Sequence, residues 1–145
     1  MYLTKLRLAT NIMGMFKYYN LPHAEVFIFD DFLIKQVKEG ELVSYKETET
    51  FKELLDIHFK NKKVAYISNR VHSFSINPMV YKEAEKIPNL IAVAIIPGSE
   101  SMRSNAEFEK QFYHKPYGIF DNLTDAIAWV KTVFDKEKVN NKKII

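Results

Sequence analysis

The sequence predicts an α/β domain with a mostly parallel sheet and an antiparallel strand on its N-terminal side. Short apolar runs typical of buried strands alternate with longer segments in which apolar residues recur at helical spacing. Two adjacent β-prone runs near the N-terminus are separated only by Asp30 and Asp31, which favour a tight turn. The chain has 145 residues and no cysteine, so one hydrophobic core is expected to stabilise it without disulfides.

The first expected elements are a hairpin and an amphipathic helix. Residues 25–30 and 32–40 are the β-prone runs on either side of the turn. The second run alternates between two phases, one with Phe32, Ile34 and Gln36 and the other with Leu33, Lys35 and Val37. Residues 44–61 then place apolar side chains at helical spacing, with Thr48 or Thr50 as the expected N-cap.

A buried strand, a short helix and a second buried strand follow. Residues 63–68 have a continuous apolar centre, which is expected for a strand covered on both faces of a parallel sheet. A helix is expected from the Asn77 cap to just before Pro88, because the residue before a proline is pushed out of the helical region. Residues 90–96 are the most hydrophobic segment and are expected to form the central strand.

A third helix, a last strand and a final helix complete the expected order. Pro97 and Gly98 end the preceding strand, and Ser99 or Ser101 is expected to cap the next helix. Residues 117–121 form the last expected strand. The final helix is expected to begin with the capping pair Asn122 and Asp125 and to bury Leu123, Ile127, Val130 and Phe134. The order ββαβαβαβα predicts right-handed crossovers between parallel strands.

The domain is expected to lie in residues 1–136, followed by a basic, flexible C-terminal tail in residues 137–145, which are rich in lysine and lack apolar periodicity. Much of the net charge of +3 comes from this segment, whereas Lys and Glu are interspersed elsewhere, as in KETETFKELL and YKEAEK. This mixed pattern argues against nucleic acid as a partner. No run approaches the roughly 18 to 20 apolar residues of a membrane span, and no signal peptide is expected. A cytoplasmic location is therefore expected.

Four segments, taken together, resemble a known family. They are FIFDDFLIKQVKEG, YISNRVHSFSINPMVYKEAEKIPNL, AVAII and GIFDNLTDAIAWV, and they fall in this order within about residues 20–135. The family that they resemble is the SpoIIAA-like family of the STAS superfamily (sulfate transporter and anti-sigma-factor antagonist). The resemblance implies a two-layer α/β sandwich and a small cytoplasmic regulatory or ligand-binding module. The family fold is similar to the CRAL-TRIO lipid-transfer fold, which adds an amphipathic ligand to the expectations.

The resemblance places control in the loop of residues 68–77. In anti-sigma-factor antagonists, a serine after the third strand is phosphorylated by a partner kinase, and the added charge breaks the complex. Ser73 and Ser75 are the nearest hydroxyl groups in this chain, so they are the expected phosphosites. The chain departs from the family pattern because the usual Asp-Ser pair is missing and Asn77 takes the cap position.

The same loop supports two other interpretations. Arg70 and His72 precede a helix N-terminus, where free N–H groups and a guanidinium favour a phosphate or carboxylate. The alternative is that Arg70 pairs with an acidic neighbour while Ser73 and Ser75 only satisfy turn amides. Phe74 lies between polar neighbours, and an exposed aromatic side chain there would mark a partner or ligand surface.

The sequence lacks motifs for catalysis, cofactor binding and metal binding. No GxSxG, GxGxxG or P-loop pattern is present. The four histidines, His23, His58, His72 and His114, show no metal-ligand spacing. His58 lies on the apolar side of the first long helix, where a packed histidine is expected. We therefore expect a non-enzyme with no cofactor and no metal.

The working surface is expected where the loops of residues 68–77 and 97–101 meet at the carboxyl ends of parallel strands. One hypothesis is a regulatory or protein-interaction module controlled at the first loop. The other is a carrier that binds an anionic or amphipathic small molecule in a pocket there, and a homodimer is compatible with either. A pocket continuous with the core beside Arg70 favours the carrier, and a flat rim favours the switch. The residues expected to contact the partner or ligand are Ser68, Asn69, Arg70, His72, Ser73, Phe74, Ser75 and Asn77.

Overall fold

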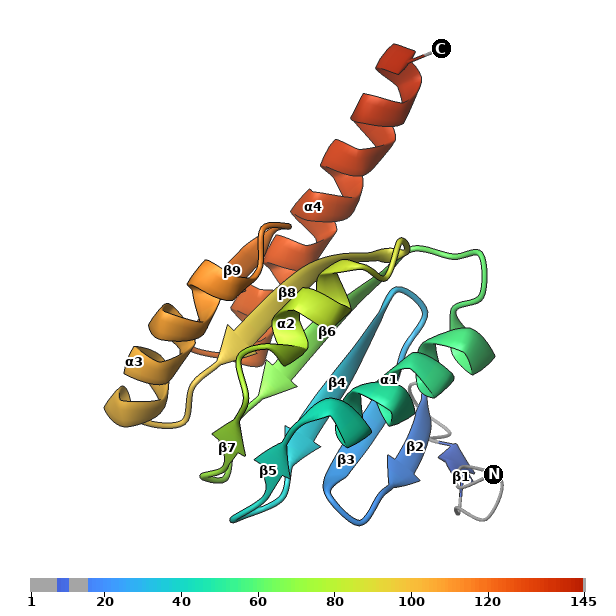
Figure 1. Ribbon diagram of the computed structural model, residues 1–145. Coiled ribbons are helices and arrows are strands. Elements are labelled where there is room, and N and C mark those ends of the chain that lie inside the picture. The colour runs from blue at the N-terminus through green and yellow to red at the C-terminus, as the bar shows by residue number, and fades with distance from the viewer. Residues whose placement is uncertain (1–7, 11–15, 145) are drawn as a thin grey trace.

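A computed structural model describes residues 8–10 and 16–144 and contains a seven-stranded mixed sheet flanked by helices (Figure 1). The strand order is β1-β2-β3-β4-β6-β8-β9. These strands are β1 (Leu8–Thr10), β2 (Lys17–Asn20), β3 (Ala24–Ile28), β4 (Phe32–Val37), β6 (Val64–Asn69), β8 (Leu90–Ile96) and β9 (Tyr117–Ile119). The helices are α1 (Tyr45–His58), α2 (Val80–Glu85), α3 (Glu100–Glu109), the short 3-10 helix η2 (Lys110–Phe112) and α4 (Leu123–Ile144).

The sheet is antiparallel at its N-terminal side and parallel elsewhere. Strands β1 to β4 pair antiparallel, whereas β4, β6, β8 and β9 pair parallel. The expected hairpin is confirmed as β3 and β4, and the Phe29 N–H closes its turn by donating to the Phe32 carbonyl at 2.9 Å. The expected α/β fold with a mostly parallel sheet is therefore confirmed, with two additional strands before the hairpin.

Helix α1 forms where its periodicity predicts, but its cap differs from the prediction. The Glu47 carboxylate accepts hydrogen bonds from the Ser44 N–H at 2.9 Å and from the Ser44 hydroxyl at 3.0 Å. Ser44 is thus the N-cap, and the predicted cap at Thr48 or Thr50 is wrong. The Thr48 hydroxyl instead donates to the Ser44 carbonyl at 3.3 Å. The expected packing of His58 is confirmed, because its Nε2 lies 2.7 Å from the hydroxyl oxygen of Tyr19, a buried core residue.

Alternate side chains of each strand build cores on the two faces of the sheet. Leu33 and Val64 pack with residues of α1 on one face, where α2 and α3 also lie. Ile34 and Ala65 pack with residues of α4 on the other face. The expected packing of helices on a sheet is confirmed. Helix α4 covers the opposite face of the sheet, so the fold has one more layer than the expected two (Figure 1).

Strand β8 is the most deeply buried strand, as predicted. All seven of its residues are buried, and it pairs with β6 on one side and β9 on the other. Ala94 packs toward α4, while Val93 and Ile95 pack toward α2 and α3. The strand is therefore interior and covered on both faces, although β4 holds the middle position of the seven strands.

Helix α4 continues through most of the segment expected to be a tail. It runs to Ile144 without interruption, and Figure 1 shows its last turns extending past the edge of the sheet. The sequence predicts a basic, flexible tail in residues 137–145, whereas the structure has residues 137–144 in this helix. The segment contains good helix formers such as Lys and Glu and no Gly or Pro. The helix therefore continues beyond its last buried side chains. None of the described helices combines the length and the apolar character needed to cross a membrane.

The loop after β6 is partly ordered by a second, two-stranded sheet. Strand β7 (Ser75–Ile76) pairs parallel with β5 (Leu42–Val43). The Gly40 N–H also donates to the Ser73 carbonyl at 2.8 Å. The Asn77 side-chain oxygen accepts a hydrogen bond from the Met79 N–H at 3.1 Å. Helix α2 then begins at Val80 with Met79 as its N-cap, two residues after the predicted cap at Asn77. Backbone pairing with residues 40–43 therefore holds this loop in place.

Candidate functional site

A cleft of about 400 Å³ lies between the loop of residues 70–78 and helix α3. Polar groups in its lining come from both loops that the sequence predicts to converge, with Ser73 and Ser75 from the first and Ser99 and Ser101 from the second. The loops meet closely, because a Cβ added at Gly98 would collide with the Arg70 carbonyl oxygen. The rest of the lining is Arg70, Phe74, Ile76, Pro78, Met102, Asn105, Phe108 and Glu109.

The floor of the cleft is a buried ion pair. Arg70 and Glu109 are only 4% and 3% exposed. The guanidinium donates from Nη1 to Glu109 Oε2 at 2.9 Å and from Nη2 to Glu109 Oε1 at 2.6 Å. Its Nη2 also donates to the Tyr81 hydroxyl at 3.1 Å, and its Nε donates to Ser68 Oγ at 3.3 Å. Tyr81 completes the network by donating its hydroxyl proton to Glu109 Oε1 at 2.5 Å.

This network determines the charge of the floor. Burial opposes the charged form of Arg70, but the hydrogen bonds and the negative charge of Glu109 outweigh it, so the pKa of the guanidinium lies above its ordinary value. Burial raises the pKa of the Tyr81 hydroxyl well above its ordinary value, which keeps it a neutral donor. One positive and one negative group therefore balance each other. The bidentate geometry that an external anion would need is taken by Glu109.

The structure thus shows the alternative interpretation of Arg70, in which it pairs with an acidic neighbour. The other polar residues of the loop do not converge with it on one anion site. His72 is exposed, with Nδ1 3.8 Å from Glu39 Oε2. The Asn69 side chain donates to Gln36 Oε1 at 2.8 Å. Asn77 caps the turn before α2, as described above.

Phe74 does not project into solvent. Its side chain is half-buried and packs against the cluster of Ala24, Val37 and Val43. Its ring centroid lies 5.3 Å from Arg70 Cζ, so the ring also contacts the guanidinium. The exposed aromatic side chain of the cleft is instead Phe108 from α3, which is 55% exposed. The Phe108 ring also contacts the Phe112 ring, with centroids 5.4 Å apart.

The two expected phosphosites are accessible. The side chains of Ser73 and Ser75 are exposed and line the cleft. The Ser73 N–H donates to Glu39 Oε2 at 3.0 Å, and the Ser75 N–H donates to the Glu41 carbonyl at 2.9 Å. Because these are backbone bonds, both hydroxyl groups are available to solvent and to a modifying enzyme.

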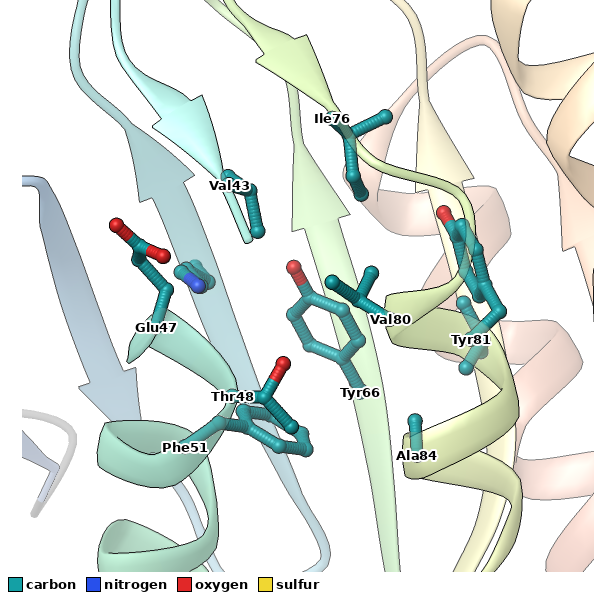
Figure 2. Close-up of a pocket in the computed structure, with 11 residues that line it drawn as sticks. Val43, Glu47, Thr48, Phe51, Tyr66, Ile76, Val80, Tyr81 and Ala84 are labelled. Carbon is teal, nitrogen blue, oxygen red and sulfur yellow. The ribbon is translucent and has the colours of Figure 1, made fainter. Parts of the chain in front are cut away.

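A second, smaller pocket of about 50 Å³ lies between α1 and α2, on the other side of Tyr81 (Figure 2). Figure 2 shows the side chains of Thr48, Phe51, Tyr66 and Val80 turned toward the space between the two helices. Lys35 from β4 also lines this pocket and is only 6% exposed. Tyr81 lines this pocket while its hydroxyl joins the floor of the cleft, so it separates the two hollows.

Sequence reasoning missed Glu109, Tyr81 and Lys35. Glu109 and Tyr81 meet Arg70 across sequence separations of 39 and 11 residues, and no local pattern signals such a contact. Lys35 had a signal, because it shares the strand phase of Leu33 and Val37, both of which are buried. Among residues 8–10 and 16–144, no three His, Asp or Glu side chains gather in a way that could hold a metal ion.

A solved structure with a similar arrangement is described as an uncharacterized protein from the DUF3478 family with a SpoIIAA-like fold, from Shewanella loihica PV-4. The two share 13% sequence identity, with a TM-score of 0.48, over 86% of this chain and 91% of that chain. No protein-family model matches the sequence, and no curated protein matches it.

Proposed function

We propose that this chain is a non-catalytic interaction module that holds a peptide segment of a partner protein in the cleft between the 70–78 loop and α3. The observation that carries the proposal is the preformed shape of this cleft over a buried, hydrogen-bonded floor. A volume of about 400 Å³ suits one or two side chains of a partner. A rigid floor also reduces the entropy lost on binding.

The lining favours a particular peptide chemistry. Ser73 and Ser75 on one side and Asn105 on the other offer side-chain groups for the main chain of a peptide. Phe108 and Met102 offer an apolar contact for a side chain. The charges of Arg70 and Glu109 balance each other, so the cleft does not select strongly for an anionic group. The expected ligand is therefore an uncharged segment with one apolar anchor residue.

Control of this cleft by phosphorylation is part of the proposal. A phosphate on Ser73 or Ser75 adds about −1.5 to −2 charges in a cleft whose lining contains Arg70 as its cation, already paired with Glu109. The phosphate would occupy part of the cleft, and Arg70 could not neutralise its charge because Arg70 is already paired with Glu109. Phosphorylation should therefore weaken peptide binding without unfolding the domain. We place this role in the cytoplasm, in keeping with a chain that contains no cysteine.

Replacing Phe108 with alanine should weaken peptide binding by at least about tenfold, because an exposed aromatic side chain at a preformed cleft is a typical binding hot spot. Peptides selected from a phage-displayed library against the wild-type protein supply the probe, and calorimetry gives the affinity. In NMR spectra the selected peptides should shift amide signals of residues 70–78 and 99–109. Ile57→Ala on α1 is the matched control, since Ile57 is 50% exposed and does not line the cleft. Equal affinity for wild type and Phe108→Ala, or peptides that shift other residues, would contradict the proposal.

The variants Ser73→Asp and Ser75→Asp should each keep the free energy of unfolding within roughly 1 kcal/mol of wild type, since both side chains are exposed. Each should bind the selected peptides more weakly than wild type. Ser104→Asp is the control, because Ser104 is exposed on α3 but does not line the cleft. If all three variants bind equally well, the proposed phosphorylation control is wrong. Native mass spectrometry of the same samples would reveal a homodimer, the other partner compatible with the sequence.

A further inference from the structure

Lys35 is a buried lysine whose side chain reaches a pocket of mostly apolar character. The pocket lies between α1 and α2 over strands β4, β6 and β8 (Figure 2). Val43, Phe51, Ile76 and Val80 form much of its wall. A fully buried lysine is rare unless its ammonium group is paired, because removal of the charge from water is costly. The contacts of this ammonium group therefore indicate whether the pocket could bind an anion.

Within the described part of the chain, the Lys35 ammonium group has no close anionic partner. No carboxylate oxygen of residues 8–10 and 16–144 lies within 4.0 Å of Nζ, and no hydrogen bond from Nζ to these residues is present. Glu47 attracts the ammonium group from a longer distance. One oxygen of that carboxylate, Oε2, already accepts the N–H and the hydroxyl of Ser44. The pocket thus contains a cation to which the described residues offer no contact partner.

Burial lowers the pKa of Lys35 to about 8, although the negative charge of Glu47 acts in the opposite direction. The titratable groups around it are Glu47 from α1, Tyr66 from β6, Tyr81 from α2 and His23 from the turn before β3. Burial raises the pKa of Tyr66, so its hydroxyl stays protonated and can donate. At neutral pH the pocket therefore offers the Lys35 ammonium group and the neutral Tyr66 hydroxyl group, and the Glu47 carboxylate also lies in its lining.

We infer that this pocket binds a short-chain monocarboxylate, with its carboxylate against Lys35 Nζ and its aliphatic tail against Val43, Ile76 and Val80. A carboxylate supplies the missing counter-ion, and an apolar tail matches the pocket wall. The space of about 50 Å³ admits only a few atoms of water size, which limits the tail to a short chain. This inference is independent of the peptide role proposed for the cleft.

Propionate is the probe, and propionamide is its neutral counterpart of nearly equal shape. Propionate should shift methyl signals of Val43, Ile76 and Val80 in a saturable manner and should bind more tightly than propionamide. Lys35→Met retains the apolar length of the side chain and should weaken propionate binding by more than about tenfold, the loss typical of a hydrogen bond to a charged group. Propionamide binding should change little. Lys46→Met is the control, since Lys46 is exposed at the start of α1 and does not line the pocket.

Two further measurements separate a built site from incidental binding. Propionate affinity should fall as the pH rises above about 8, because Lys35 then loses its proton, whereas propionamide affinity should stay constant. Ala84→Leu should fill the pocket and weaken both ligands, which tests the location in a variant that keeps Lys35. The inference is overturned if propionate gives no saturable shift of these methyl groups. It is also overturned if wild type and Lys35→Met bind propionate equally, or if Ala84→Leu leaves both affinities unchanged.

Discussion

Replacing Glu109 with leucine should lower the free energy of unfolding by about 3 to 5 kcal/mol, the loss expected when one partner of a buried ion pair is removed. The carboxylate accepts two hydrogen bonds from Arg70 and one from Tyr81. Without it, the guanidinium remains buried at 4% exposure, with uncharged contacts to the Tyr81 hydroxyl, the Ser68 hydroxyl and the Phe74 ring. Urea denaturation followed by circular dichroism measures the change.

A neighbouring glutamate on the same helix supplies the control. Glu107 is exposed on α3, so Glu107→Leu alters the same charge at a similar helix position and should change stability by less than about 1 kcal/mol. The double variant Arg70→Met with Glu109→Leu should recover much of the loss, because a buried ion pair can often be replaced by apolar residues of similar volume. A single Glu109→Leu variant as stable as Glu107→Leu would show that the pair does not support the floor of the cleft.

The substitution Ala94→Asp should prevent folding at room temperature or lower the stability by more than about 4 kcal/mol. Ala94 is completely buried in β8 and packs against α4. A carboxylate there would be surrounded by apolar side chains such as Ile34 and Val130. Burial of an unpaired charge costs several kcal/mol even after its pKa adjusts.

Thermal melts followed by circular dichroism test this expectation. Ala128→Asp is the matched control, since Ala128 is exposed on α4 and should tolerate the same change with a loss of roughly 1 kcal/mol or less. Ala94→Ser places a smaller, uncharged polar group at the same position, and its loss of stability should lie between those of the other two variants. An unchanged melting temperature for Ala94→Asp would contradict the assignment of residues 90–96 as a strand covered on both faces.

The order and type of the elements could be predicted because local patterns reflect burial. The continuous apolar run of residues 90–96 indicates a strand covered on both faces, and β8 has this environment. The Asn122 and Asp125 pair predicts the start of the last helix, where the Asp125 N–H donates to Asn122 Oδ1 at 2.8 Å. Each of these signals depends on residues a few positions apart, so a single sequence contains them in full.

The end of α4 could not be predicted in this way. Its buried stripe stops near Val133 and Phe134, and the following residues have no apolar period. Packing therefore explains the first half of the helix, and backbone propensity together with continuity explains the second half. A helix that already exists extends at low cost, and a pattern search that requires an apolar face does not detect this.

By itself the sequence determined the α/β class, the hairpin, the buried strands and the convergence of the 68–77 and 97–101 loops at one rim. Only the tertiary structure decided the roles of the charged residues. Arg70 was compatible with an anion site or an ion pair until Glu109, 39 positions away, was placed against it. Lys35 was one member of an alternating strand until α1 and α2 covered it. The physical reason is that the role of a charged group depends on its partners and its access to water, and contacts distant in sequence determine both.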